Sequence, residues 1–125
     1  MSDKNFSGIR NNGVLPDAAG MTIPEDIRDL LGDYAESVNS MLDELEKSTL
    51  SYEAGDRGKD NTDSIKRILH KIKGEASMTG IEEISELTHQ TEFAFDELAE
   101  NQRPDMLLRY KDWICKAVSG ITENV

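Results

Sequence analysis

The chain has 125 residues, of which 37% are hydrophobic and 31% charged, and its formal net charge is -11. This length suits one domain with a modest core, and so acidic a surface disfavours nonspecific binding to nucleic acid or anionic membranes. The single cysteine excludes an intrachain disulfide and a cysteine-based zinc site. Because no signal-peptide pattern or transmembrane-length stretch is present, we expect a cytoplasmic protein without membrane insertion.

The first 22 residues are rich in glycine, asparagine, serine and aspartate and show no apolar period. This composition predicts a flexible N-terminal leader over residues 1–22, followed by one domain over residues 23–125. Pro24 then suits the first position of a helix, and Glu25 and Asp26 suit the positive end of its dipole.

Apolar residues recur every three or four positions in four segments, which predicts four amphipathic helices. The expected helices run from Ile27 to about Thr49, from about Asp63 to Thr79, from about Ile81 to Glu100, and onward from the break "NQRP". Because no strand alternation appears, we predict an all-α, up-down-up-down four-helix bundle. The expected core includes Ile27, Leu30, Leu31, Tyr34, Val38, Ile65, Ile68, Leu69, Ile72, Ile84, Leu87, Phe95, Leu98, Leu107, Tyr110 and Ile114, with Trp113 and Cys115 in the core or at its edge.

The stretch "RILHKIKGEASMTG", Arg67–Gly80, places a histidine on the polar side of the second helix. At 100° per residue, His70 points about 140° away from Ile65, so we expect its ring to be exposed. Gly74 would leave the ring uncovered, because a helical side chain leans over the preceding turn. Glycine in a helix costs about 1 kcal/mol relative to alanine, and open access to the ring would offset that cost. Ser77, one turn further, is also small.

The residues around His70 are basic, in contrast to the rest of the chain. A basic patch on an acidic protein suits an acidic partner pocket or a phosphoryl group. A neutral imidazole has one nitrogen free to act as a nucleophile. The patch consists of Lys66, Arg67, Lys71 and Lys73.

The third helix offers an acceptor for the other imidazole nitrogen. In a helical hairpin around Gly80, His70 lies level with roughly Gln90. Because each side chain leans toward the N-terminus of its helix, Glu92 would reach back to the level of the ring. We therefore expect Glu92 to orient His70 and fix its tautomer, with His89 behind it.

The stretch "HKIKGEASMTG" resembles the signature of histidine-phosphotransfer (HPt) domains, roughly H-x-[IL]-K-G-x-[AS]-x-x-x-G. Together with "THQTE", residues 88–92, it is similar to the phosphotransfer domains of CheA chemotaxis kinases. The resemblance extends from about Asp26 to Leu98 and implies a four-helix bundle with a phosphoryl group on Nε2 of the histidine. Its implied site residues are His70 as phospho-acceptor, Lys73 for electrostatic assistance, Gly74 for clearance, Glu92 to hold Nδ1, and His89 at the second-histidine position.

Three features depart from the pattern of this family. Glu75 stands where a small residue is usual, and its charge would lie near the site. Met78 and Thr79 stand where CheA domains often have an aromatic residue. A fifth helix is missing, which leaves open whether the chain is a complete protein or part of a larger kinase.

The resemblance implies a phosphorelay intermediate that binds no cofactor itself. No Walker loop is present, so a histidine kinase catalytic domain, in the same polypeptide or another, would use ATP to phosphorylate His70. The aspartate of a response-regulator receiver domain would then accept the group, with Mg2+ bound to the receiver. We expect partners to dock on the face formed by Lys66, Arg67, Lys71, Ser77 and Ile81.

Two other interpretations remain open. His70, His89 and Glu92 could form a metal site between facing helices, although the adjacent lysines would repel a cation. Tight stoichiometric zinc binding would favour this interpretation. A helical adaptor that only docks partners is the second, and it predicts that His70→Gln leaves every activity intact.

Overall fold

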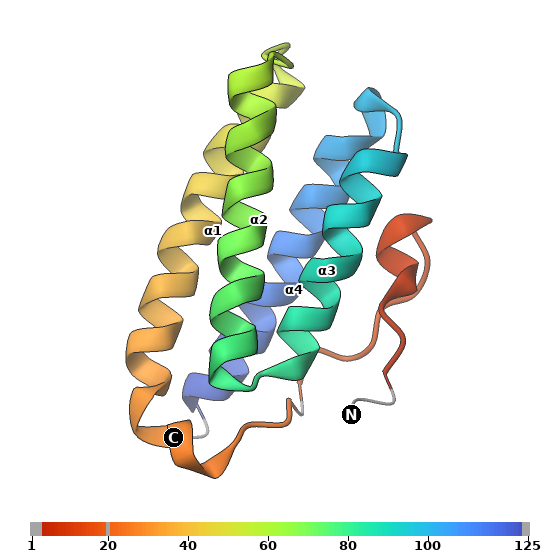
Figure 1. Cartoon of the computed structure of the whole chain (residues 1–125). Helices are drawn as coiled ribbons and strands as arrows, with labels where there is room; N and C mark the ends of the chain where they lie inside the picture. Colours follow the sequence, from red (N-terminus) through yellow and green to blue (C-terminus); the bar gives the residue numbers. More distant parts are fainter. Residues whose placement is uncertain (1–3, 20, 124–125) are drawn as a thin grey trace.

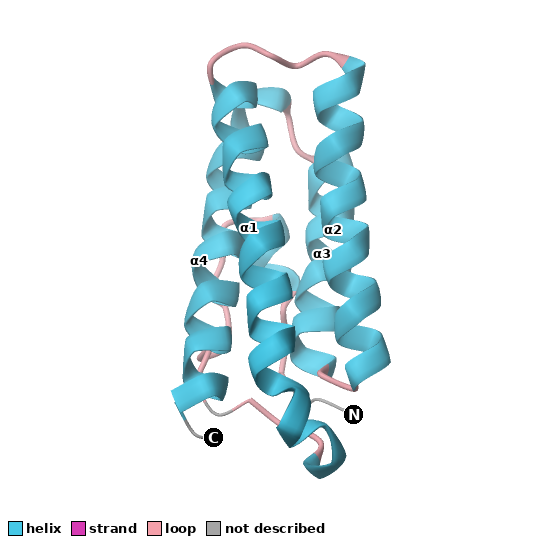
Figure 2. Cartoon of the chain, turned by 90° about the vertical axis from the view of Figure 1, so that its left-hand side faces the viewer, coloured by secondary structure: helices cyan, strands magenta, loops and turns pink. Residues whose placement is uncertain are grey.

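Four helices make up most of the chain, for which a computed structural model describes residues 4–19 and 21–123. They are α1 (Leu31–Glu53), α2 (Lys59–Thr79), α3 (Glu82–Glu97) and α4 (Arg103–Glu123). Each helix runs antiparallel to the next, and α4 packs against both α3 and α1 to close the bundle (Figure 1). Short loops join the helices, and no strand is present in the described residues (Figure 2). The prediction of an all-α, up-down-up-down bundle is confirmed.

The apolar period of the sequence forms the interior of the bundle. Most residues predicted for the core are buried, Trp113 among them, and Cys115 is half-buried at the edge. Leu30 is an exception, with 54% of its surface exposed. Leu30 is the last residue of η2 (Glu25–Leu30), which is a 3-10 helix. Because that helix has about three residues per turn, Leu30 leaves the register that a longer α-helix would have given it.

Two other predicted boundaries are displaced for local reasons. α2 begins at Lys59 rather than near Asp63, since Gly58 takes an extended conformation before it and Lys59 forms an ion pair with Asp63 at 2.6 Å. This first turn is polar and therefore carries no apolar period. α3 ends at Glu97 because Leu98 is extended, with ψ 151°. The 3-10 turn η3 (Glu100–Gln102) then leads into α4.

The turn between α2 and α3 is a Schellman motif centred on a left-handed glycine. Gly80 has φ 80°, and its N–H donates to the carbonyl of Ser77 while the N–H of Ile81 donates to that of Ala76. This pattern places the residue after the glycine against the last turn of the helix. Ile81 is accordingly fully buried. The prediction that Ile81 lines a docking surface is therefore wrong.

The predicted flexible leader is instead packed against the bundle over its described residues. A 3-10 turn, η1 (Ser7–Arg10), lies against α3 and α4, and Figure 1 shows this segment beside α3 on the side away from α2. Phe6 and Ile9 are each 1% exposed. The ring of Phe6 meets that of Trp113 edge to face, with centroids 5.3 Å apart. Phe6 and Ile9 lie in a largely polar segment and form no repeating apolar pattern, so the sequence did not predict that this segment packs on the bundle.

Polar contacts hold the backbone of the leader in place. Trp113 donates its indole N–H to the carbonyl of Pro16 at 2.7 Å, and Arg109 donates to the carbonyls of Gly8 and Gly13. A Cβ at Gly8 would lie 2.4 Å from the carbonyl oxygen of Val14, so the loop requires a glycine there. These contacts satisfy backbone groups that a solvated leader would leave to water.

We expect Phe6→Ala to lower the free energy of unfolding by about 3 kcal/mol, because it removes a fully buried aromatic ring. Urea titration followed by the fluorescence of Trp113, the one tryptophan of the chain, measures the change. Val14→Ala is the control, since Val14 is 91% exposed and a surface substitution changes stability by about 0.5 kcal/mol at most. Equal urea midpoints for both variants would contradict the packing described here.

Candidate functional site

His70 lies on the outer face of α2, as its angle from the core predicts. Its side chain is 74% exposed, while Leu69 and Ile72 of the same turn are fully buried. The Nδ1 atom faces Glu92 of α3, at 3.8 Å from Oε2. Since the two ring nitrogens lie on opposite sides of the ring, Nε2 is directed away from this carboxylate. The arrangement presents one nitrogen to a reaction partner and the other to the protein.

Glu92 connects His70 to the lysine one turn further along α2. One carboxylate oxygen lies 2.8 Å from Nζ of Lys73, and the other is the oxygen that faces the histidine. Glu92 and Lys73 are both about one-quarter exposed, in contrast to the histidine. The ion pair fixes the carboxylate, so it can orient the ring and favour the tautomer with a proton on Nδ1. The structure therefore brings together His70, Lys73 and Glu92 as predicted.

Gly74 provides clearance next to the ring. A Cβ built on this residue would meet no other atom within 4 Å. No packing inside the protein therefore requires glycine at this position. The open space on this side of α2 faces outward, where a reaction partner would have to approach.

Two further contacts join α2 to α3 on the same side as Lys73. Lys66 forms an ion pair with Asp96 at 2.7 Å, and the hydroxyls of Ser77 and Ser85 are hydrogen-bonded at 2.7 Å. Lys66 and Ser77 were predicted as partner-binding residues, yet both are engaged within the bundle. Asp96 was not predicted as a site residue, although it lies one turn beyond Glu92 on the same face of α3.

The predicted role of His89 finds no support in the geometry. Its ring packs edge to face on Phe93, with centroids 4.9 Å apart, on an exposed part of α3. Within the described residues it makes no hydrogen bond or ion pair with His70 or Glu92. On α3, Phe93 lies one turn beyond His89 and Glu92 lies three residues beyond it, and the ring contact of His89 is with Phe93.

Thr88, which opens the "THQTE" stretch, has a structural role. Its buried hydroxyl donates to the carbonyl of Ile84 and lies 2.7 Å from the hydroxyl of Tyr110, which therefore donates to it. This bond fixes α3 against α4 from inside the core. Burial raises the pKa of Tyr110 far above its ordinary value. The phenol therefore stays protonated and keeps this bond at neutral pH.

Glu75 does not add its charge to the face of His70. Its carboxylate accepts a hydrogen bond from the hydroxyl of Ser37 at 3.1 Å, which directs it toward α1. The pKa of buried Tyr34 is raised first by burial and then by the charge of Glu75. The departure from the family pattern at this position therefore contributes to the contact between α1 and α2.

The exposed side of α2 also carries an apolar residue that was not predicted to be functional. Met78 is 88% exposed and lies two turns beyond His70. Arg67 and Lys71 are exposed as well, and neither makes a hydrogen bond or ion pair with the described residues. An exposed methionine on an otherwise polar face would have been the signal in the sequence.

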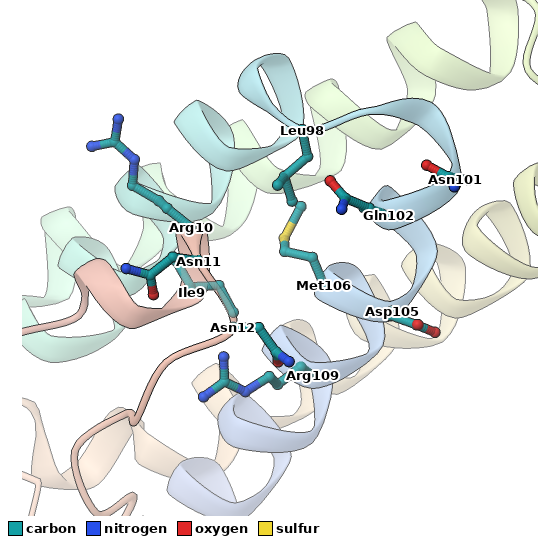
Figure 3. A pocket seen from close by; sticks show the side chains of 10 residues that line it. All are labelled: Ile9, Arg10, Asn11, Asn12, Leu98, Asn101, Gln102, Asp105, Met106 and Arg109. Atoms are coloured by element: carbon teal, nitrogen blue, oxygen red, sulfur yellow. The ribbon is translucent and has the colours of Figure 1, made fainter.

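A pocket of about 390 Å³ lies elsewhere, between η1 and the first turns of α4. Figure 3 shows Leu98 and Met106 side by side on its wall, with Gln102 next to them, while Arg10 points away. Its lining contains none of the predicted site residues. The candidate chemistry of this chain therefore belongs to an exposed helix face and not to this pocket.

The acidic and metal-ligating side chains of the described residues bear on the metal interpretation. No group of three or more histidine, cysteine, aspartate or glutamate side chains there could hold a metal ion. Glu92 is already paired with Lys73, so a cation at this carboxylate would have to displace an ammonium group.

Among the described residues, no helix has the length and apolar character needed to cross a membrane.

Comparisons with known proteins agree with the geometry. The family model for the Hpt domain matches residues 29–117. The chain is 32% identical over 92 residues to the chemotaxis protein CheA of Borreliella burgdorferi, an alignment that covers 69% of this chain and 11% of that relative. No solved structure matches significantly. With a family match over most of its length and an exposed histidine at the motif position, the chain belongs to the Hpt domain family.

Proposed function

We propose that this chain is the phosphotransfer domain of a two-component phosphorelay and that His70 carries the phosphoryl group. A histidine kinase catalytic domain would phosphorylate it with ATP, and an aspartate of a receiver domain would accept the group. The observation that carries this proposal is the exposed ring of His70, whose Nδ1 faces Glu92. The similarity to a CheA protein supports a role in chemotaxis-type signalling in the cytoplasm.

The site residues have distinct roles in this reaction. With the proton on Nδ1 facing Glu92, the lone pair on Nε2 attacks the γ-phosphorus of ATP and ADP leaves. Glu92 stabilises the positive charge that develops on the ring, and Lys73 holds that carboxylate in place. In the second step a receiver carboxylate attacks phosphorus and Nε2 of His70 is the leaving group. Both steps depend mainly on positioning and charge neutralisation, with Mg2+ and ATP bound to the partner domains.

We expect His70→Gln to abolish labelling of the chain. The purified protein is incubated with a histidine kinase catalytic domain and labelled ATP, then challenged with receiver domains and Mg2+. Wild type should gain acid-labile, alkali-stable label and lose it to a receiver. His89→Gln is the matched control and should be labelled like wild type, because its ring packs on Phe93 and forms no hydrogen bond or ion pair with His70 or Glu92 in the described residues. Equal labelling of His70→Gln and wild type would refute the proposal and favour the adaptor or metal interpretation, which zinc titration would separate.

We expect Glu92→Gln to slow the labelling of His70 about tenfold, a loss of about 1.4 kcal/mol in transition-state stabilisation. The amide keeps the size of the side chain but removes the charge that faces the ring and pairs with Lys73. Asp96→Asn makes the same chemical change one turn away, at the partner of Lys66, and should leave the rate within about twofold of wild type. Single-turnover labelling measures both rates. If labelling slowed equally in Glu92→Gln and Asp96→Asn, the cause would be the loss of one negative charge from α3 and not the position of Glu92 beside His70.

We expect Gly74→Gln to slow the labelling of His70 without lowering the stability of the folded protein. The folded protein should be as stable as wild type or up to about 1 kcal/mol more stable, because glutamine is the better helix former and the position is open. Labelling should slow about tenfold or more, since the new side chain covers the approach to His70. Gly32→Gln in α1 is the control for adding a glutamine to a helix, because a Cβ there also meets no atom within 4 Å. An unchanged labelling rate for Gly74→Gln would show that clearance is not its role.

A further inference from the structure

His70 divides the exposed surface of α2 into two flanks. On one side, Lys66, Lys73 and Ser77 lie within about 60° of it at 100° per residue, and we call these residues the α3 flank. On the other side, Arg67, Lys71 and Met78 lie within about 100° of it, and we call these the α1 flank. The names follow from the contacts: the first group bonds to α3, and beyond the second group Glu75 bonds to Ser37 of α1.

All three residues of the α3 flank are engaged inside the bundle. Lys66 pairs with Asp96, Lys73 pairs with Glu92, and Ser77 shares a hydrogen bond with Ser85, each at 2.7 or 2.8 Å. A partner that docked here would have to compete with these contacts or leave them unsatisfied. Burying a charged group without its counterion is costly, so this flank is a poor docking surface.

The α1 flank has the opposite character. Arg67 and Lys71 are exposed and form no hydrogen bond or ion pair with the described residues. Met78 is 88% exposed, and among the exposed large apolar side chains of the described residues only Val14 is more exposed. The open space at Gly74 lies on the same side, between His70 and Met78. A methionine that adapts its shape, next to unpaired cations, is typical of protein interfaces.

We propose that the receiver domain docks asymmetrically on the α1 flank, with Met78 as its apolar anchor and Arg67 and Lys71 opposite acidic groups of the receiver. This inference rests on the proposed function. A receiver that holds Mg2+ with carboxylates presents an acidic surface around its aspartate, which is complementary to the two unpaired cations. The net charge of -11 repels such a surface from most of this protein, so the cations also set its orientation.

The test measures transfer from labelled His70 at increasing concentrations of a receiver that accepts the group from wild type. Met78→Ser should raise the half-saturating receiver concentration about tenfold and leave the maximal rate within about twofold of wild type. Lys71→Glu should also raise it, by about fivefold at low salt, with the difference lost near 0.5 M salt. The unchanged maximal rate distinguishes weaker docking from damage to the reacting groups.

Three control variants make the measurement decisive. Val14→Ser and Lys116→Glu remove an exposed apolar residue of the leader and an exposed lysine of α4, the helix that packs on α1 and α3, and both should behave as wild type. Asp96→Asn, which removes the charge that pairs with Lys66 of the α3 flank, should not change the half-saturating concentration. A wild-type response from Met78→Ser, or a larger effect of Asp96→Asn, would overturn asymmetric docking while the proposed function stood. A wild-type chain that takes no label from any kinase would overturn both.

Discussion

The register of the α2–α3 hairpin is the constraint on which the candidate site depends. Three pairs across these helices are placed symmetrically about Ile81: Ser77 with Ser85, His70 with Glu92, and Lys66 with Asp96. The Schellman turn sets this centre, because its hydrogen bonds pin Ile81 under the end of α2. A shift of one residue in α3 would turn Glu92 by about 100°, and a shift in α2 would turn His70 by as much, so either would separate the carboxylate from the imidazole. One left-handed glycine therefore positions a carboxylate twelve residues further along.

This register also explains why the basic residues of α2 do not form one continuous positively charged surface beside the acidic residues of α3. Lys66 and Lys73 contribute to a basic patch in the sequence, but in the fold each is neutralised by a carboxylate of α3. The remaining unpaired cations, Arg67 and Lys71, lie on the opposite side of His70. What looked like a uniform basic patch is thus a neutralised flank and a positively charged flank. The histidine lies at the boundary between them, where it can be held on one side and approached on the other.

The sequence was sufficient to predict the bundle, the exposure of His70 and its pairing with Glu92, because these follow from local periodicity and hairpin geometry. The failures involve contacts over long sequence separation or inside turns. Packing of the leader depends on Trp113 and Arg109, about a hundred residues away, and a few apolar side chains carry no period that would reveal it. Ile81 was misplaced because a turn residue has no helical face from which to infer burial. His89 was placed near the site by its level in the hairpin and by the resemblance to the family, whereas in the structure its ring packs on Phe93.

The leader and the site occupy opposite sides of α3, and this separation has an energetic consequence. A functional face must keep an exposed imidazole, a helix-weakening glycine and an uncovered methionine, none of which stabilises the fold. The leader adds buried apolar surface on the far side, through Phe6 and Ile9, and its N-terminal end contributes Lys4 to the buried carboxylate of Glu83 at 3.4 Å. The backbone N–H of Thr22 donates to the same carboxylate at 2.9 Å, so two points of the chain before α1 are attached to one residue of α3. Because α3 also carries Glu92, packing on its far side restrains the helix that orients His70 without touching the face where partners would dock.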